Sequence, residues 1–142
     1  MTKATILIVE DNPDISQPLT DAFRFNDFDV LQAFTAVQAL QFASEHRPDL
    51  ILMDIQLPDL DGLSVADTLK KDPDTQHIPI VAMTAYEVVG QQAKAISRTC
   101  VGYAQKPARP RDLINLASAV LKLQADPAPR RRMDNTPRTN KK

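Results

Sequence analysis

Five short apolar runs, separated by longer stretches with helical periodicity, constrain the fold of this chain more than any other feature. The runs occupy residues 4–10, 29–34, 49–54, 78–84 and 101–106, and each predicts a β-strand. The first, third and fourth runs are almost continuous Ile, Leu, Val and Met, which is typical of strands covered on both faces. The sequence therefore predicts an α/β protein with a buried sheet.

The stretches between these runs carry apolar residues at a spacing of three or four, which predicts a helix after each strand. The positions that set this spacing are Leu19, Phe23, Ala36, Leu40, Ala43, Leu63, Ala66, Leu69, Ala93, Ile96, Leu113, Leu116, Val120 and Leu123. Strands that alternate with helices pair in parallel, and right-handed crossovers place helices on both faces of the sheet. We therefore predict a doubly wound, five-stranded parallel sheet.

The charge of the chain is unevenly distributed on the two sides of Gln124. The net charge is −1, but the six basic and two acidic residues of segment 125–142 give it a charge of +4, which leaves −5 on residues 1–124. The same segment has three prolines and no aromatic residue, so it cannot bury enough apolar surface to offset the entropy of ordering. We predict one folded domain over residues 1–124 and a disordered basic tail over residues 125–142.

Composition and cysteine content exclude several classes of protein. No apolar run approaches the ~20 residues that span a bilayer, and the acidic residues directly after the first apolar run are unlike a signal peptide. We therefore expect a cytoplasmic protein without a membrane segment. Cys100 is the only cysteine, so neither an internal disulfide nor a thiolate metal site can form within one chain. The acidic folded part argues against direct binding of DNA, which requires clustered Lys and Arg.

Polar residues follow the apolar runs at the points where the predicted strands end. Glu10 and Asp11 end the first strand, Asp54 the third, Thr84 the fourth and Lys106 the fifth. The carboxyl ends of parallel strands share one edge of the sheet, which is where ligands bind in open α/β sheets. With the strand order 2-1-3-4-5, the first and third strands are neighbours, and Asp11 lies beside Asp54.

Carboxylates gathered in this way repel one another, and a divalent cation relieves the repulsion. Mg²⁺ fits best, because it takes hard oxygen ligands and is typically held by one or two carboxylates and a phosphate oxygen. Beside such a cation, a carboxylate can act as a nucleophile toward a phosphoryl group and form an aspartyl phosphate. Lys106 can neutralise the phosphoryl oxygens, and the Thr84 hydroxyl can donate a hydrogen bond to one of them.

Four segments carry a family resemblance, namely ILIVEDN (6–12), PDLILMDIQLPDLDG (48–62), IPIVAMTAY (78–86) and YAQKP (103–107). Their sequences and their order resemble the receiver domains of bacterial two-component response regulators of the single-domain type. The resemblance covers about residues 4–123, nearly the whole predicted domain. It implies a flavodoxin-like fold with the strand order 2-1-3-4-5.

The resemblance also implies a role for each residue at the sheet edge. Asp54 accepts a phosphoryl group from a histidine kinase or a phosphotransfer protein. Asp11 and Asp54 bind Mg²⁺ directly, the backbone carbonyl of Gln56 is a third protein ligand, and Glu10 acts mostly through water.

A two-state switch is implied by the same resemblance. Lys106 contacts the phosphoryl group, Thr84 moves toward it, and Tyr103 rotates from an exposed to a buried position. A phosphoryl group adds a charge of about −1.5 to −2 and three acceptor oxygens, which is enough to bias a loop whose two states differ little in free energy. The peptide bond between Lys106 and Pro107 is commonly cis in receivers.

Partners of this family commonly dock on the surface formed by the fourth helix, the fifth strand and the fifth helix. We therefore expect a signalling protein rather than an enzyme, which acts through contacts with a downstream protein and is a monomer or a weak homodimer. Tyr86 and Gln56 occupy positions that tune the access of hydrolytic water in receivers, so we expect a long-lived phosphorylated state. Asp59 and Asp61 are expected to be solvated rather than bound to the metal.

Two other functions fit only parts of the sequence. Residues Arg130, Arg131 and Arg132 could make the tail an output element that binds nucleic acid or an acidic surface, but they lack interleaved aromatic residues. A phosphatase of the haloacid dehalogenase type also uses a magnesium-bound aspartate. That family has a D-x-D nucleophile after its first strand, whereas this chain has the sequence EDN at 10–12.

Overall fold

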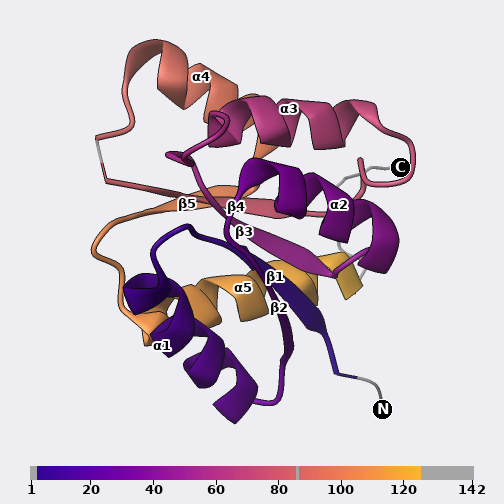
Figure 1. Cartoon of the computed structure of the whole chain (residues 1–142), viewed down its shortest axis with the longest axis vertical. Helices are drawn as coiled ribbons and strands as arrows, with labels where there is room; N and C mark the ends of the chain where they lie inside the picture. The colour runs from indigo at the N-terminus through magenta and orange to yellow at the C-terminus, as the bar shows by residue number, and fades with distance from the viewer. Residues whose placement is uncertain (1–2, 86, 126–142) are drawn as a thin grey trace, which may run out of the picture.

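A computed structural model describes residues 3–85 and 87–125, in which five strands and five helices alternate along the chain (Figure 1). The strands are β1 (Thr5–Val9), β2 (Asp29–Ala33), β3 (Leu50–Asp54), β4 (Ile80–Thr84) and β5 (Gly102–Gln105). The helices are α1 (Pro13–Phe25), α2 (Ala36–His46), α3 (Gly62–Lys71), α4 (Gly90–Thr99) and α5 (Pro110–Ala125). The strands form one parallel sheet in the order β2-β1-β3-β4-β5, which confirms the predicted fold and strand order.

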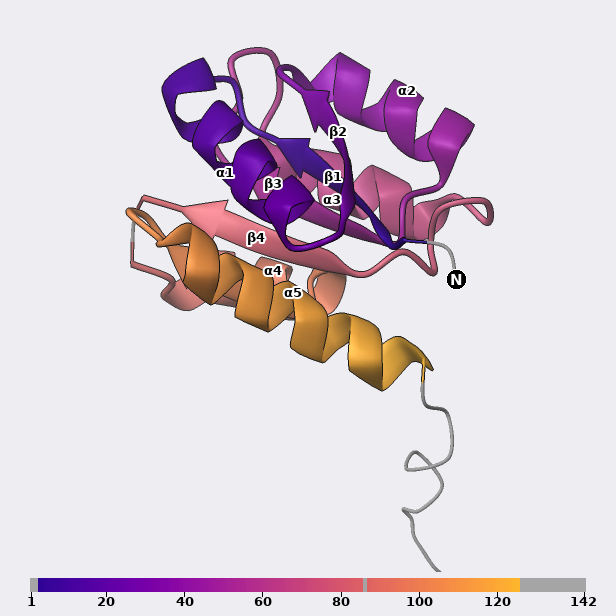
Figure 2. The same ribbon diagram turned by 90° about the horizontal axis from the view of Figure 1, so that it is seen from below.

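Helices cover both faces of this sheet. α1 and α5 lie on one face, whereas α2 and α3 lie on the other, with α4 beside α3 (Figures 1 and 2). Successive residues of β1 point into two different cores: Ile6 and Ile8 pack with α1 and α5, and Leu7 and Val9 pack with α2 and α3. All four are fully buried, which is the physical reason for the continuous apolar runs of the central strands.

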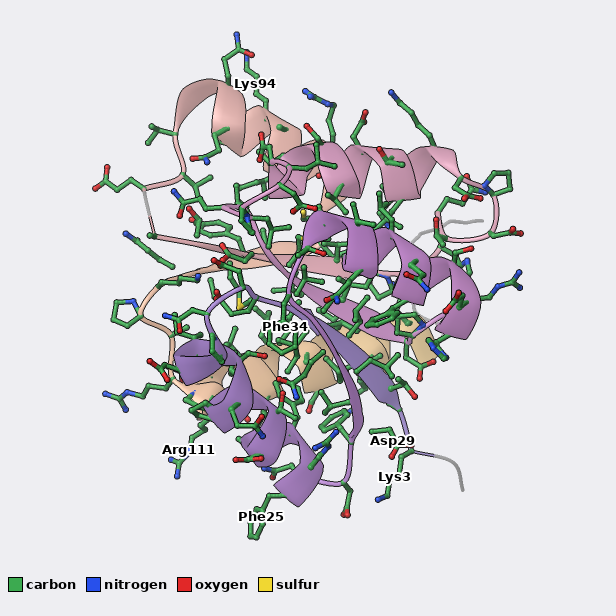
Figure 3. The ribbon with its side chains drawn as sticks, viewed as in Figure 1. Lys3, Phe25, Asp29, Phe34, Lys94 and Arg111 are labelled. Atoms are coloured by element: carbon green, nitrogen blue, oxygen red, sulfur yellow. The ribbon has the colours of Figure 1, made fainter. Side chains whose placement is uncertain are left out.

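Helix α1 shows how the helical periodicity sorts apolar side chains. It begins after Asn12, whose side chain accepts a hydrogen bond from the N–H of Asp14 at 2.9 Å. Leu19 and Phe23 are buried against the sheet. Phe25 is 88% exposed and projects away from the body of the molecule (Figure 3). The apolar stripe of the helix therefore ends with Phe23.

Most of the predicted tail lies outside the described residues. Of residues 125–142, the structure describes only Ala125, which is the last residue of α5. Within residues 3–85 and 87–125, no helix combines the length and the apolar character needed to cross a membrane.

Gly62, the first residue of α3, lies against the end of β3. Its N–H donates a hydrogen bond to the carbonyl oxygen of Ile55 at 2.6 Å. A Cβ atom at this position would overlap the carbonyl oxygen of Asp54 and would lie 2.6 Å from the Cα of Ile55. Only glycine therefore allows α3 to begin this close to the strand that carries Asp54.

Replacement of Gly62 by alanine should destabilise the protein, because the added Cβ forces two backbone segments apart. We expect G62A to lower the free energy of unfolding by about 1–3 kcal/mol. The matched control is G102A, whose Cβ would meet Leu116 Cδ1 at 3.8 Å, an ordinary van der Waals distance. Urea unfolding followed by circular dichroism measures both variants. Equal losses in G62A and G102A would contradict the steric role of Gly62.

Candidate functional site

Five of the residues predicted to form the site lie at the carboxyl edge of the sheet. Glu10 and Asp11 follow β1, Asp54 ends β3, Thr84 ends β4 and Lys106 follows β5. One carboxylate oxygen from each of the three acidic residues lies within 4.8 Å of the other two. The parallel topology thus gathers side chains that are as many as 96 positions apart in the sequence.

The acidic cluster is buried at its base and open on one side. Glu10 and Asp54 are only 1% and 2% exposed, whereas Asp11 is exposed. Burial of an ionised carboxylate costs free energy unless the charge is paired or hydrogen-bonded. The two buried carboxylates therefore require partners within the protein.

Lys106 is the charged partner of both buried carboxylates. Its Nζ donates hydrogen bonds to Glu10 Oε1 at 2.7 Å and to Asp54 Oδ2 at 3.0 Å. Burial alone would lower the pKa of Lys106, but the hydrogen bonds to Glu10 and Asp54 outweigh this effect and raise the pKa above its usual value. Lys106 is therefore charged at neutral pH, and three carboxylates with one ammonium leave the cluster a formal charge of −2.

Backbone N–H groups hold the remaining oxygens of the two buried carboxylates. Glu10 Oε2 accepts a hydrogen bond from the N–H of Asn12 at 3.1 Å, and Asp54 Oδ1 accepts one from the N–H of Gln56 at 3.0 Å. Each oxygen of Glu10 and Asp54 thus has a donor. The orientation of both side chains is fixed before any ligand binds.

The main chain after β5 brings Lys106 to the cluster. The N–H of Lys106 donates a hydrogen bond to the carbonyl oxygen of Thr84 at 2.6 Å, which extends the pairing of β4 and β5 by one residue. The peptide bond between Lys106 and Pro107 is cis, as the resemblance leads us to expect.

Thr84 and Tyr103 lie on the same face of the sheet. In the pairing of β4 with β5, Thr84 lies opposite Gln105 and Ala82 lies opposite Tyr103. Residues two apart in a strand point to the same face, so the two side chains share the side covered by α3 and α4. Thr84 is buried and Tyr103 is 51% exposed.

The loop between β3 and α3 contains two acidic residues outside the cluster. Asp59 and Asp61 are exposed, as expected, but each also accepts hydrogen bonds at the start of a helix. Asp61 Oδ1 accepts one from the N–H of Leu63 at 3.0 Å and caps α3, while Asp59 accepts two from Ala36 and Val37 at the start of α2.

Sequence reasoning missed both of these capping contacts. An Asp directly before a predicted helix is a local signal for the Asp61 cap. The contacts of Asp59 span 22 and 23 residues, and no local signal indicates them.

The donor set of the acidic cluster fits a hard divalent cation. Glu10, Asp11 and Asp54 offer carboxylate oxygens within 4.8 Å of one another, and the cluster has an excess of negative charge. Mg²⁺ prefers oxygen ligands of this kind and is commonly held by one or two carboxylates. The residues present therefore fit the magnesium site that the sequence predicts.

Comparisons with known proteins point to one family. The model of the response regulator receiver domain matches residues 6–118. The polar-differentiation response regulator DivK of Brucella anthropi is 39% identical over 103 residues, which cover 72% of this chain and 84% of that protein. DivK of Brucella ovis is 39% identical over 107 residues, which cover 75% of this chain and 86% of that protein.

Solved structures show the same likeness. A CheY-like receiver domain protein from Methanospirillum hungatei superimposes with a TM-score of 0.81 at 26% identity, covering 87% of this chain and 98% of that chain. The receiver domain of a sensor histidine kinase from Pseudomonas aeruginosa, solved with magnesium coordinated in its active site cleft, gives 0.77 at 28% identity and covers 85% and 99%. The chain therefore belongs to the receiver domain family of two-component response regulators.

Proposed function

We propose that this receiver is a phosphoacceptor, in which Asp54 takes a phosphoryl group from a histidine kinase or a phosphotransfer protein with Mg²⁺ as cofactor. The observation that carries this proposal is the pair of hydrogen bonds from Lys106 to Glu10 and Asp54, beside a third carboxylate at the open edge of the sheet. This arrangement combines a nucleophile, a cation for the phosphoryl oxygens and a site for a metal.

Asp11, Asp54 and the backbone carbonyl of Gln56 would hold Mg²⁺, and Glu10 would act through water. Mg²⁺ bound at this cluster would offset the negative charge that opposes the approach of a phosphoryl group.

Asp54 is the proposed nucleophile because it is the cluster residue that ends a central strand and contacts Lys106. The phosphoryl group passes from a histidine nitrogen of the donor to a carboxylate oxygen of Asp54, with the histidine as leaving group. Lys106 Nζ lies 3.0 Å from Asp54 Oδ2, so the ammonium can pair with an oxygen of the transferred group. Because Asp54 is buried, the donor must approach from the exposed side of Asp11.

Thr84 and Tyr103 would couple the phosphorylation of Asp54 to a change of the protein surface at β5. The Thr84 hydroxyl moves toward the phosphoryl group, and the Tyr103 ring rotates inward to fill the space that Thr84 leaves. Their location on the same face of the sheet, with Thr84 buried and Tyr103 exposed, supports this pair of movements.

The surface formed by α4, β5 and α5 is the proposed docking site for the downstream protein. Val89 directly precedes α4 and is 64% exposed, and Val101 directly precedes β5, two residues before the exposed Tyr103, and is 53% exposed. Exposed apolar side chains of this kind favour a protein partner. We propose a cytoplasmic signalling protein that is a monomer or a weak homodimer and does not bind DNA directly.

The proposed division of the chain is a receiver domain over residues 1–124 and a basic tail over residues 125–142. The arginines that would make the tail an output element, Arg130 to Arg132, lie outside the described residues, as does Tyr86. Membership in the receiver family leaves the dehalogenase-type phosphatase without support.

The first test is the transfer of a phosphoryl group to Asp54. We incubate the chain with Mg²⁺ and a small phosphodonor and measure its mass by mass spectrometry. Wild type should gain one phosphoryl group and D54N should gain none, because the amide is not a nucleophile at this position. D67N, which changes an exposed aspartate on α3 in the same way, should be labelled like the wild type. Equal labelling of D54N would place the acceptor elsewhere.

The labelled wild type should keep its phosphoryl group for minutes or longer after the donor is removed. The reason is that Gln56, two positions beyond Asp54, and Tyr86, two positions beyond Thr84 and outside the described residues, occupy positions that tune the access of hydrolytic water in receivers. Mass spectra recorded at intervals measure the decay. Loss of the label within seconds would contradict a long-lived state.

The third test concerns the neutralising role of Lys106. K106M leaves Glu10 and Asp54 buried without their ammonium, so we expect a loss of about 1–3 kcal/mol in the free energy of unfolding without metal. Mg²⁺ should narrow this deficit, because a cation at the cluster offsets the same carboxylates. K94M is the control, since Lys94 projects into solvent from α4 (Figure 3). Urea unfolding with and without Mg²⁺ measures both variants, and an equal Mg²⁺ effect on K106M and K94M would refute this role.

A further inference from the structure

The loop between β3 and α3 is closed at its base by backbone contacts. The N–H of Gly62 donates a hydrogen bond to the carbonyl oxygen of Ile55, and Gln56 pairs with Asp61 in an isolated antiparallel bridge. Gln56 also donates its N–H to Asp54 Oδ1. The base of the loop is therefore continuous with the proposed phosphoacceptor and with the carbonyl proposed to bind the cation.

The tip of the same loop, residues 57–60, is joined to the start of α2 by hydrogen bonds to the side chain of Asp59, while Leu57 packs against the core cluster that contains the buried alanines of α2. Asp59 Oδ1 accepts a hydrogen bond from the N–H of Ala36 at 2.8 Å, and Asp59 Oδ2 accepts one from the N–H of Val37 at 3.2 Å. These hydrogen bonds lower the pKa of Asp59, with the one from Ala36 contributing most, so the carboxylate is ionised at neutral pH.

Helix α2, which donates these two hydrogen bonds, is held in a fixed position by the core. Ala36, Ala39 and Ala43 are fully buried against the sheet, so the helix cannot shift without opening the core. Its first turn contains no acidic residue, and its own cap, Thr35, accepts a hydrogen bond from the N–H of Gln38 only at the third helical position. Asp59 therefore supplies from another part of the chain the negative charge that favours a helix N-terminus.

We propose that Asp59 is a positioning residue for the cation site: by tying the loop tip to α2, it holds the backbone carbonyl of Gln56 in place for Mg²⁺. This inference rests on the proposed function, because it assumes that the cluster binds Mg²⁺. A loop without the tie must lose conformational freedom when the cation binds, which weakens binding. A loop held beforehand avoids this loss, as an outer group that orients a metal ligand does.

Titration calorimetry of the full chain with Mg²⁺ tests the inference with three variants. We expect D59A to bind Mg²⁺ about 10-fold more weakly than the wild type. D59N keeps an oxygen that can accept a hydrogen bond from α2 and should bind more tightly than D59A. T35A is the matched control, because it removes the hydrogen bond that Thr35 accepts from the N–H of Gln38 at the same end of α2 and leaves the loop unchanged. T35A should bind Mg²⁺ as tightly as the wild type does.

Nuclear magnetic resonance gives a second readout that a general loss of stability would not change. In the wild type and in T35A, Mg²⁺ should shift the amide resonances of Ala36 and Val37, because Asp59 connects them to the loop. In D59A these two resonances should stay in place while that of Gln56 still moves at high Mg²⁺. Circular dichroism measures whether each variant is folded. If D59A does not fold, the comparison is made between D59N and the wild type.

The outcomes separate the inference from the function on which it rests. If the wild type and D59A bind Mg²⁺ equally well, the positioning role is overturned and the phosphoacceptor function stands. A loss in T35A as large as the loss in D59A also overturns the role, since the stability of α2 would then explain both. If the wild type binds no Mg²⁺, the proposed function and the inference fail together.

Discussion

The pairing of one ammonium with two buried carboxylates is the interaction on which the whole site depends. Glu10 and Asp54 are almost fully buried, and an ionised carboxylate at such depth is costly unless a partner is close. Lys106 provides that partner although it follows β5, the edge strand that is separated from β3 by β4. It reaches the cluster because the chain after β5 remains bonded to the end of β4, through the hydrogen bond from Lys106 N–H to the Thr84 carbonyl.

The sheet and the loops contribute to the site in different ways. Strands β1 and β3 are neighbours with both faces buried, so they fix the carboxylates of Glu10 and Asp54 through the core of the protein. In the loop after β3, residues 56–61 are exposed except for Leu57, which is partly buried and packs against the core. The backbone of this loop is also held by the close approach of Gly62 to β3 and by the hydrogen bonds that Asp59 accepts from α2. The part of the site that would present a backbone carbonyl therefore has fewer buried contacts than the part that carries the carboxylates.

The arrangement of strands and the gathering of the acidic residues could be predicted from the sequence, because both follow from periodicity and from the rule that parallel strands end at one edge. The predicted strands 4–10 and 101–106 are slightly too long, since Glu10 and Lys106 lie just beyond β1 and β5 and contact each other there. The contact of Asp59 with α2 could not be predicted, because it joins residues 22 and 23 positions apart and depends on the shape of a loop tip.

The charge balance of the cluster explains how one site could serve both cation binding and switching. Three carboxylates and one ammonium leave a formal charge of −2, which a divalent cation would neutralise. A phosphoryl group on Asp54 would carry about −1.5 to −2 in place of the carboxylate's −1, so the cluster would again have an excess of negative charge. Two groups that could respond are the Lys106 ammonium, which is hydrogen-bonded to Asp54, and the Thr84 hydroxyl at the end of the adjacent strand. Because Thr84 shares a sheet face with Tyr103, a movement of Thr84 in response to this charge would also reach the surface of β5.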